Sequence, residues 1–480
     1  MSFESDTPRD TNQLRRDAVG LMQIICFVIA AAGPLAATVG ASPAAFAFGN
    51  GIGVPAVYVL VGAMYIIFSV GYTAMSRHVS NTGAFYAYVT LGLGRPMGVG
   101  AAFVAVLTYT TVQCAIYGLF GFMVNQLLKS HYGIDVPWWA LALGVMLVVH
   151  LCGARNVDFS GKLLAVLMVL ELATLLLMDA AVIGSGGGST GFSAAPFELK
   201  HLTEPGLGIS IIFAVTCFLG FEATAIFSEE ARDPKRTIPR ATYATVIVIT
   251  IVYALSTWAL VQAYGTDGVV AAAKNDPANF VFNVNTKLVG GWSTDIMNVL
   301  LVTSLFAALL SFHNTINRYF YSLGRESLLW QGLAKTHPVH NSPYVAGRVQ
   351  TATAAGIVAL FALFNQDPFA ILYSWMSTIS TIGILAVQFM VAVAIVGFFW
   401  KKPTAASAWH RLIAPIISAV GLAICLVLVL QNLPLLSGSE SPVVASLPYV
   451  VFLTWVAGMG VALWVRRSKP EVYFRIGQAT

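Results

Sequence analysis

Twelve apolar stretches of about 20 residues follow one another along this chain, and they constrain its fold more than any other feature. In lipid only helices and closed barrels satisfy every backbone polar group, and stretches of this length fit helices. Charged residues make up 10% of the 480 positions, against about 25% in a soluble domain. We therefore predict an all-α polytopic membrane protein with 12 transmembrane helices at roughly 19–46, 53–75, 97–128, 136–154, 162–183, 207–228, 240–264, 293–322, 346–364, 369–400, 411–433 and 444–466.

The lysines and arginines gather on one side of this predicted bundle. With the N-terminus inside, 22 of the 26 fall on the cytoplasmic side, as the positive-inside rule requires. We expect residues 1–18 and 467–480 to form cytoplasmic tails of a protein in the cytoplasmic membrane. The same placement explains the net charge of +5, so the bilayer is the expected partner and nucleic acid is not.

Two of the predicted spans are interrupted near their centres. The first contains AAAGPLAA at 30–37, where Pro34 removes a backbone donor and clashes with the carbonyl four residues back. The sixth contains FLGFE at 218–222, where Gly220 can leave helical geometry. Paired interruptions in corresponding positions indicate a midplane binding site, because freed amides bind carboxylates and freed carbonyls bind cations. The alternative is that glycine and proline are simply common in transmembrane helices.

Two acids lie inside apolar runs where a charge is costly. Glu222 stands beside the second interruption, and Glu171 lies in the fifth span with no basic residue near it in sequence. A carboxylate at the bilayer centre costs at least ~2.5 kcal/mol, so such groups normally face protein, water or a ligand. Because desolvation disfavours the charged form, each acid can take up a proton or stay ionised against a cation. The alternative is that each carboxyl only bonds to neighbouring helices and fixes their positions.

The other polar groups at this depth suggest structural roles. Asp179 lies toward the outer end of the fifth span, where we expect it to reach water. His150 and His313 are isolated in sequence, with no metal-ligand spacing around them. The charge cluster after the sixth span includes Glu230 and Arg232, which are candidates for an inner gate of ion pairs. The alternative is that this cluster only anchors the topology.

Four stretches of the sequence are similar to the patterns of one transporter family. They are GFEATAIFSEEARDPKRTIPRA at 220–241, NTGAFYAY at 81–88, RYFYSLGRE at 318–326, and His337-Pro338 followed by Pro343. On these motifs the chain resembles the amino acid–polyamine–organocation (APC) superfamily over residues 15–466, and the first motif is the most specific.

The resemblance implies a fold and a domain organisation. It implies a five-plus-five inverted repeat in which helices 1 and 6 are broken, followed by two extra helices, which agrees with the twelve predicted spans. The implied units are a core at 19–400, repeat one at 19–183, repeat two at 207–400, and helices 11 and 12 at 411–466.

The resemblance also implies a site around the two interruptions. The implied substrate-binding residues are Ala32, Gly33, Pro34, Leu35, Gln113, Thr216, Phe218, Gly220, Glu222 and Phe312. Phe218 and Phe312 would act as aromatic gates; the alternative is that they only pack in the core. Several family members carry a lysine that mimics a coupling cation at the position of Glu171, and the glutamate here departs from that pattern. We expect Glu171 and Glu222 to couple transport to an ion, with Ser304 of the eighth span near Glu171.

These observations favour a secondary active transporter of amino acids or related amines, driven by protons, with sodium or exchange as alternatives. A polyamine or organic-amine importer or exchanger is the second interpretation. A non-transporting sensor on the same scaffold usually carries a cytoplasmic extension, and the predicted tails are short. A channel needs a polar stripe along several spans and an enzyme needs clustered catalytic groups; the sequence shows neither pattern, and we predict no cofactor and no metal.

Overall fold

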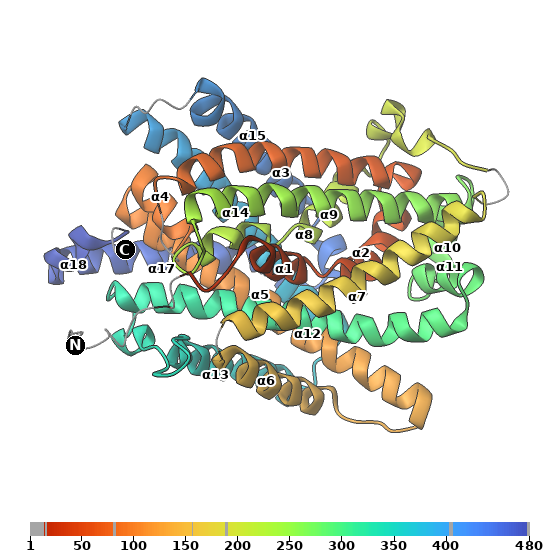
Figure 1. Ribbon diagram of the computed structural model, residues 1–480, viewed down its shortest axis with the longest axis horizontal. Helices are drawn as coiled ribbons and strands as arrows, with labels where there is room; N and C mark the ends of the chain where they lie inside the picture. Colours follow the sequence, from red (N-terminus) through yellow and green to blue (C-terminus); the bar gives the residue numbers. More distant parts are fainter. Residues whose placement is uncertain are drawn as a thin grey trace, which may run out of the picture.

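The computed structural model is helical throughout the residues that it describes, apart from turns, connecting segments and one isolated β-bridge. The axes of most of the long helices lie roughly parallel to one another, as the ribbons of Figure 1 show. The described residues are Leu14, 17–79, 83–155, 157–187, 191–402 and 407–477. The predicted tail at 1–18 and the first two residues of the motif at 81–88 therefore lie largely outside them.

Eleven helical spans in the described part of the chain are long and apolar enough to cross a membrane, and the apolar helix α6 is shorter at 17 residues. The prediction of an all-α polytopic fold is confirmed, and each of the twelve predicted spans overlaps one of these helices; the division into two repeats stays a prediction. The spans are α1 (Leu21–Ala32) with α2 (Pro34–Phe48), α3 (Val54–Ser76), α5 (Arg95–Tyr132), α6 (Trp138–Ala154), α7 (Val157–Gly184), α8 (Leu207–Cys217) with η4 (Phe221–Phe227), α9 (Pro234–Tyr264), α12 (Gly291–Arg325), α13 (Tyr344–Leu363), η6 (Pro368–Tyr373) with α14 (Ser374–Lys401), η7 (Trp409–Ile413) with α15 (Ala414–Gln431), and α17 (Pro442–Ser468).

Short helices lie at both ends of this bundle. Helices α4 and α18 lie at one end, called the terminal end here, and α10 and α11 lie at the opposite end between α9 and α12 (Figure 1). The short helices are η1 (Gly51–Gly53), α4 (Phe85–Leu93), η2 (Ala195–Phe197), η3 (Leu199–Leu202), α10 (Val269–Asn275), α11 (Phe280–Leu288), η5 (Gln331–Ala334), α16 (Leu433–Ser437) and α18 (Pro470–Arg475).

The first span is broken at Gly33. Helix α1 ends at Ala32 and α2 begins at Pro34, while Gly33 between them has left-handed backbone with φ 54°. Pro34 has no N–H to continue the first helix, and its fixed φ suits the first position of the second. A residue with a Cβ would be strained at position 33. The predicted interruption is therefore confirmed.

The sixth span is broken at Gly220 and lies against the first. Helix α8 ends at Cys217, a turn follows, and η4 begins at Phe221. Gly220 has φ 109°, and a Cβ there would come within 2.9 Å of the Cβ of Ala31 in α1. The second break thus packs directly against the end of α1, and the absence of a side chain at Gly220 permits the approach.

The segment that follows α17 packs back onto the terminal end. Ile476 is 1% exposed in an apolar cluster that includes Leu323 of α12. The amide of Gly477 donates to Oε2 of Glu326 at 2.8 Å, and the same oxygen accepts from the hydroxyl of Tyr86 in α4. Residues 470–477 therefore form a strap that joins α4, α12 and α17.

Replacing Ile476 with alanine is expected to lower the free energy of unfolding by about 2 kcal/mol or more, because a buried isoleucine loses its side-chain packing. Thermal unfolding of the detergent-solubilised protein measures the change. Phe474→Ala is the matched control, since Phe474 lies in the same segment but is 64% exposed and should cost much less. Equal losses of stability in the two variants would contradict the packing of this strap against the bundle.

Candidate functional site

Glu171 of α7 contacts the start of α2. Its Oε1 accepts a hydrogen bond from the amide of Leu35 at 2.5 Å and another from the Ser304 hydroxyl of α12 at 2.8 Å. Its Oε2 has no hydrogen-bond partner among the described residues, and the side chain is 1% exposed. The expected proximity of Glu171 and Ser304 is confirmed. One carboxylate oxygen thus holds the first break, while the other is left for a proton or a cation.

Glu222 makes the equivalent contact at the second break. The amide of Gly220 lies 3.1 Å from its Oε2 and 3.3 Å from its Oε1. The Tyr109 hydroxyl of α5 donates to Oε1 at 2.7 Å, and the Tyr72 hydroxyl of α3 donates to the Glu222 carbonyl at 2.7 Å. Glu222 is 1% exposed, so its carboxyl is held by protein groups on several sides.

Each half-helix that begins at a break is therefore met by a buried carboxyl group. The start of a helix exposes unpaired amides and carries a partial positive charge, which favours an anion. Glu171 supplies that group to α2, and Glu222 supplies it to η4. The electrostatic reason for a carboxylate at each position is thus the same, although Glu171 comes from another helix and Glu222 from η4 itself.

The two half-helices that end at the breaks share one donor. The Tyr253 hydroxyl of α9 lies 3.1 Å from the carbonyl oxygen of Ala32, the last residue of α1. It lies 3.3 Å from the carbonyl oxygen of Cys217, the last residue of α8. Sequence analysis did not single out Tyr253; the available signal is that a tyrosine in an apolar span usually needs a partner for its hydroxyl.

The residues predicted to bind substrate through their backbone lie at these breaks, and substrate binding by them stays a prediction. Gly33, Pro34, Leu35 and Gly220 are buried there, whereas Ala32 and Thr216 keep part of their surface exposed. The Thr216 hydroxyl donates to its own helix, at the Phe213 carbonyl, over 2.7 Å.

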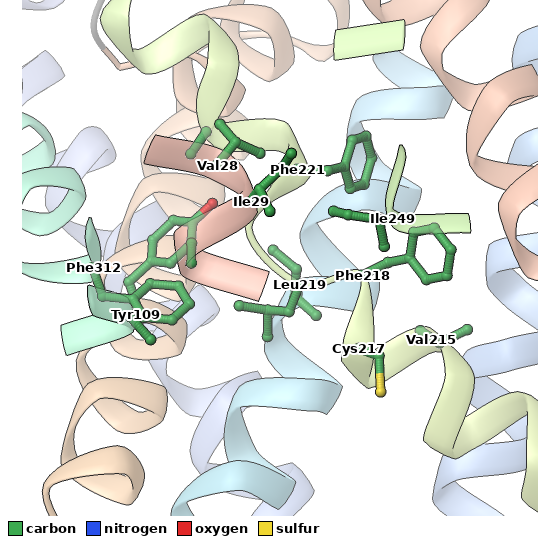
Figure 2. Close-up of a cluster of buried hydrophobic side chains, with 14 of the residues drawn as sticks. Val28, Ile29, Tyr109, Val215, Cys217, Phe218, Leu219, Phe221, Ile249 and Phe312 are labelled. Atoms are coloured by element: carbon green, nitrogen blue, oxygen red, sulfur yellow. The ribbon is translucent and has the colours of Figure 1, made fainter. Parts of the chain in front are cut away.

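The two predicted aromatic gates lie on different sides of the second break. Phe218 packs against Tyr65, with ring centroids 5.2 Å apart, whereas Phe312 packs against Tyr109 at 6.1 Å. Figure 2 shows Phe312 beside Tyr109, with Leu219 between them and Phe218. The structure thus does not bring the two phenylalanines together, and each is buried in the core.

Gln113 belongs to a polar network between α5, α12 and α13. Its Nε2 donates to the Leu309 carbonyl at 3.1 Å, and its Oε1 accepts from the Gln350 amide. Oε1 of Gln350 lies 2.7 Å from Nδ1 of His313, whose ring meets that of His150 at 6.0 Å between centroids. The packing of α6 against α12 thus brings together two histidines that are far apart in sequence, and their structural role stays a prediction.

The two glutamates of the charge cluster after the sixth span form ion pairs with α12. Arg318 donates to the Glu230 carboxylate through Nε at 2.5 Å and Nη2 at 3.1 Å, and both side chains are almost fully buried. Arg325 pairs with Glu229 at 2.7 Å with more exposure. Arg232, the predicted partner of Glu230, is exposed and donates to the Asp17 carbonyl at 2.9 Å.

Asp179 is a further buried acid of the bundle. The expectation that it reaches water is wrong, because it is 1% exposed and its Oδ2 accepts from the Ser256 hydroxyl of α9 at 2.8 Å. The contact ties α7 to α9 one helical turn from Tyr253. Asp179 thus belongs to the scaffold that positions the breaks.

The fold and this site define a multi-pass membrane protein with two helix breaks in contact, each capped by a buried acid. The chain belongs to the amino acid permease family, whose sequence model matches residues 23–473.

The chain is similar in sequence to several other transporters. An uncharacterized transporter of Mycobacterium tuberculosis H37Rv is 27% identical over 228 residues, which cover 42% of this chain and 46% of the relative. A branched-chain amino acid permease of Lactococcus lactis is 25% identical over 70% of this chain and 73% of its own length. A methylthioribose transporter of Bacillus subtilis is 21% identical over 77% and 78%. The chain thus spans about half the length of the mycobacterial relative and about three quarters of the other two.

Proposed function

We propose that this protein is a secondary active transporter of amino acids that works by alternating access, with both termini in the cytoplasm. The observation that carries the proposal is the contact between two broken helices whose four free ends all meet buried polar groups. Broken helices in corresponding positions supply midplane binding sites in transporters of this architecture. The family and the names of the relatives support amino acids as the substrate class.

The free ends of the breaks suit the two charged groups of an amino acid. Amides at the starts of α2 and η4 attract a carboxylate, and carbonyls at the ends of α1 and α8 attract an ammonium group. Ala32 and Thr216, whose surfaces stay partly exposed, lie at these ends. A substrate that binds there would interact with both repeats at once, as rocking of one bundle against the other requires.

Glu171 is the residue that we assign to coupling. Its unpartnered Oε2 is a place for a proton, and its Oε1 already contacts the first break. Protonation would weaken the attraction between this carboxyl and the start of α2, so the proton would act directly on the position of a half-helix. Sodium at the same oxygen is the alternative.

The carboxyls at both half-helix starts also support a second candidate, an importer or exchanger of organic amines. Since Glu171 and Glu222 already occupy the Leu35 and Gly220 amides, a substrate without a carboxylate needs no displacement of either acid. An amine would then bind the carbonyl ends with Glu222 as its counter-ion.

Transport by the purified protein in liposomes tests these proposals. Radiolabelled leucine and putrescine are added outside, with an imposed proton gradient or an imposed sodium gradient. We expect leucine to accumulate with the proton gradient. Accumulation of putrescine alone would favour the second candidate, accumulation only with sodium would reverse the driving ion, and binding without uptake of either would favour a sensor.

Glu222→Gln is expected to reduce coupled leucine uptake about tenfold or more, because one charge-assisted hydrogen bond at the start of η4 is lost. The amide nitrogen of glutamine would also face the Gly220 amide, donor against donor, or require the Tyr109 hydroxyl to accept where it now donates. Initial rates over a range of pH measure the effect. Tyr109→Phe is the control that removes one partner and keeps the charge; unchanged uptake and pH dependence in Glu222→Gln would contradict the role.

A further inference from the structure

The ends of α3 and α14 meet around His78 at the terminal end of the bundle. His78 follows directly on α3, which packs against both α9 and α14. Its ring contacts the rings of Phe398 and Phe399 near the end of α14, with centroids 6.0 and 5.8 Å apart. Lys402, at the end of α14, places its Nζ 5.9 Å from the centre of the Phe398 ring. The basic end of α14 therefore lies beside the end of α3.

The charged groups that act on His78 are all positive. Partial burial lowers the pKa of His78, and neighbouring positive charges lower it further. Those charges belong to Lys235 of α9, Lys402 of α14 and Arg77 at the end of α3. All three of these cationic side chains are exposed. Three cations from three different helices thus converge on one place at the surface, and we call them the cation cluster.

The cation cluster suits an anion with phosphate chemistry. Like charges that gather in this way repel one another, and a bound anion removes the repulsion. The members of the cluster come from elements far apart in the sequence, so the fold rather than one basic run brings them together. Lysine and arginine side chains form strong charge-assisted hydrogen bonds with phosphate oxygens.

The cation cluster lies at the level where lipid headgroups meet a membrane protein. Helix α3 ends at Ser76 and α14 ends at Lys401, so the cations stand where two spans end. Trp400 is 81% exposed beside this end, and Trp409, at the start of the next span, is 43% exposed. Exposed tryptophans at span ends are typical of the membrane interface. Basic pockets between spans bind the headgroups of anionic lipids, and the tryptophans favour a lipid over a soluble anion.

We propose that Arg77, Lys235 and Lys402 form a binding site for the phosphate headgroup of an anionic membrane lipid, at the junction of α3, α9 and α14. A lipid bound there links the end of α14 to the start of α9, the helix that follows the second broken span in the chain. The inference goes beyond the proposed transport function and does not depend on it.

Thermal unfolding of the purified protein in detergent tests this site, with dioleoylphosphatidylglycerol as the anionic probe and dioleoylphosphatidylcholine as the neutral one. We expect phosphatidylglycerol to raise the melting temperature above its value in phosphatidylcholine. In the double variant Lys235→Gln/Lys402→Gln, the phosphatidylglycerol concentration that gives half of this rise should increase about twentyfold, since each cation contributes roughly a factor of five. In phosphatidylcholine the double variant should unfold at the temperature of the wild type, because both side chains are exposed.

Arg236→Gln/Arg467→Gln is the matched control, because it removes two exposed cations that are not among the charges acting on His78. Arg236 lies 3.6 Å from Asp233, and Arg467 belongs to the last turn of α17. The control should keep the half-saturating lipid concentration of the wild type. Equal weakening in both double variants would show that phosphatidylglycerol responds only to the net charge of the protein, and would overturn the site.

Inorganic phosphate and glycerol phosphate, added without lipid, separate a headgroup site from a site for soluble anions. Neither anion should raise the melting temperature of the wild type. A rise with either anion that Lys235→Gln/Lys402→Gln abolishes would assign the cation cluster to a soluble phosphate compound and overturn the lipid proposal. Equal melting temperatures of the wild type in phosphatidylglycerol and phosphatidylcholine would overturn it as well.

Discussion

Glu171→Gln is expected to abolish proton-driven accumulation of leucine while exchange of leucine across the membrane continues. Glutamine keeps an acceptor for the Leu35 amide and the Ser304 hydroxyl, so the first break should retain its geometry. It cannot exchange a proton, and its amide nitrogen takes the place of the unpartnered Oε2. The variant should therefore behave like a transporter whose side chain at position 171 is always protonated. Accumulation under an imposed proton gradient and counterflow from preloaded liposomes, measured side by side, separate these two activities.

Asp179→Asn is the matched control for this prediction. Asp179 is a buried acid of the same helix, but its described contact is with Ser256 of α9 rather than with a break. We expect the control to lower stability without uncoupling transport. Normal proton-driven accumulation by Glu171→Gln would contradict the assignment of Glu171 to proton coupling. Loss of a sodium-driven accumulation in the same variant would identify Glu171 as a cation ligand instead.

The breaks and the buried acid Glu171 could be predicted because local chemistry leaves few alternatives. A Gly-Pro pair within an apolar span cannot continue a regular helix, and Gly33 does take the left-handed conformation. Glu171 was identified by the cost of a lone carboxylate in lipid, and the family arrangement placed it near Ser304. These inferences depend on depth along a helix, which the sequence gives directly.

The rest of the site depends on which way each helix faces, and hydropathy does not give that. Asp179 lies two turns from Glu171 on α7, yet whether it reaches water is decided by the packing of α9 against that face. Likewise Phe218 turns toward Tyr65, away from the side on which Phe312 lies. The partner of Glu230 is Arg318, which lies 88 residues away in sequence on α12, and the sequence did not indicate this pairing.

Arg318→Met is expected to release the terminal end of the bundle. The substitution leaves the Glu230 carboxylate buried without its partner, which costs roughly 3–5 kcal/mol in the closed arrangement. Arg318 also donates to the Asn314 carbonyl at 2.8 Å, and its guanidinium lies 4.6 Å from the centre of the Phe227 ring. We therefore expect a large shift of the protein toward a form that is open at this end.

The part that opens should include α1 and η4, the two half-helices on the side of the breaks that faces the terminal end. Residues 19 and 231 form a parallel bridge, with the amide of Val19 donating to the Glu230 carbonyl at 3.0 Å. Phe27 of α1 stacks on Phe227 of η4 with centroids 4.7 Å apart. Since these contacts join α1 to η4, breaking the ion pair to α12 should free them as one unit.

Labelling of a cysteine introduced at Ala231, which is 3% exposed, measures the opening. In a Cys152→Ser background, where the remaining native cysteines are buried, Arg318→Met should raise the labelling rate about tenfold or more. Arg325→Met removes the more exposed pair with Glu229 and should have a much smaller effect. Adding Glu230→Gln to Arg318→Met should restore slow labelling, because the uncompensated charge is gone. Slow labelling in the single Arg318→Met variant would show that the pair does not hold this end closed.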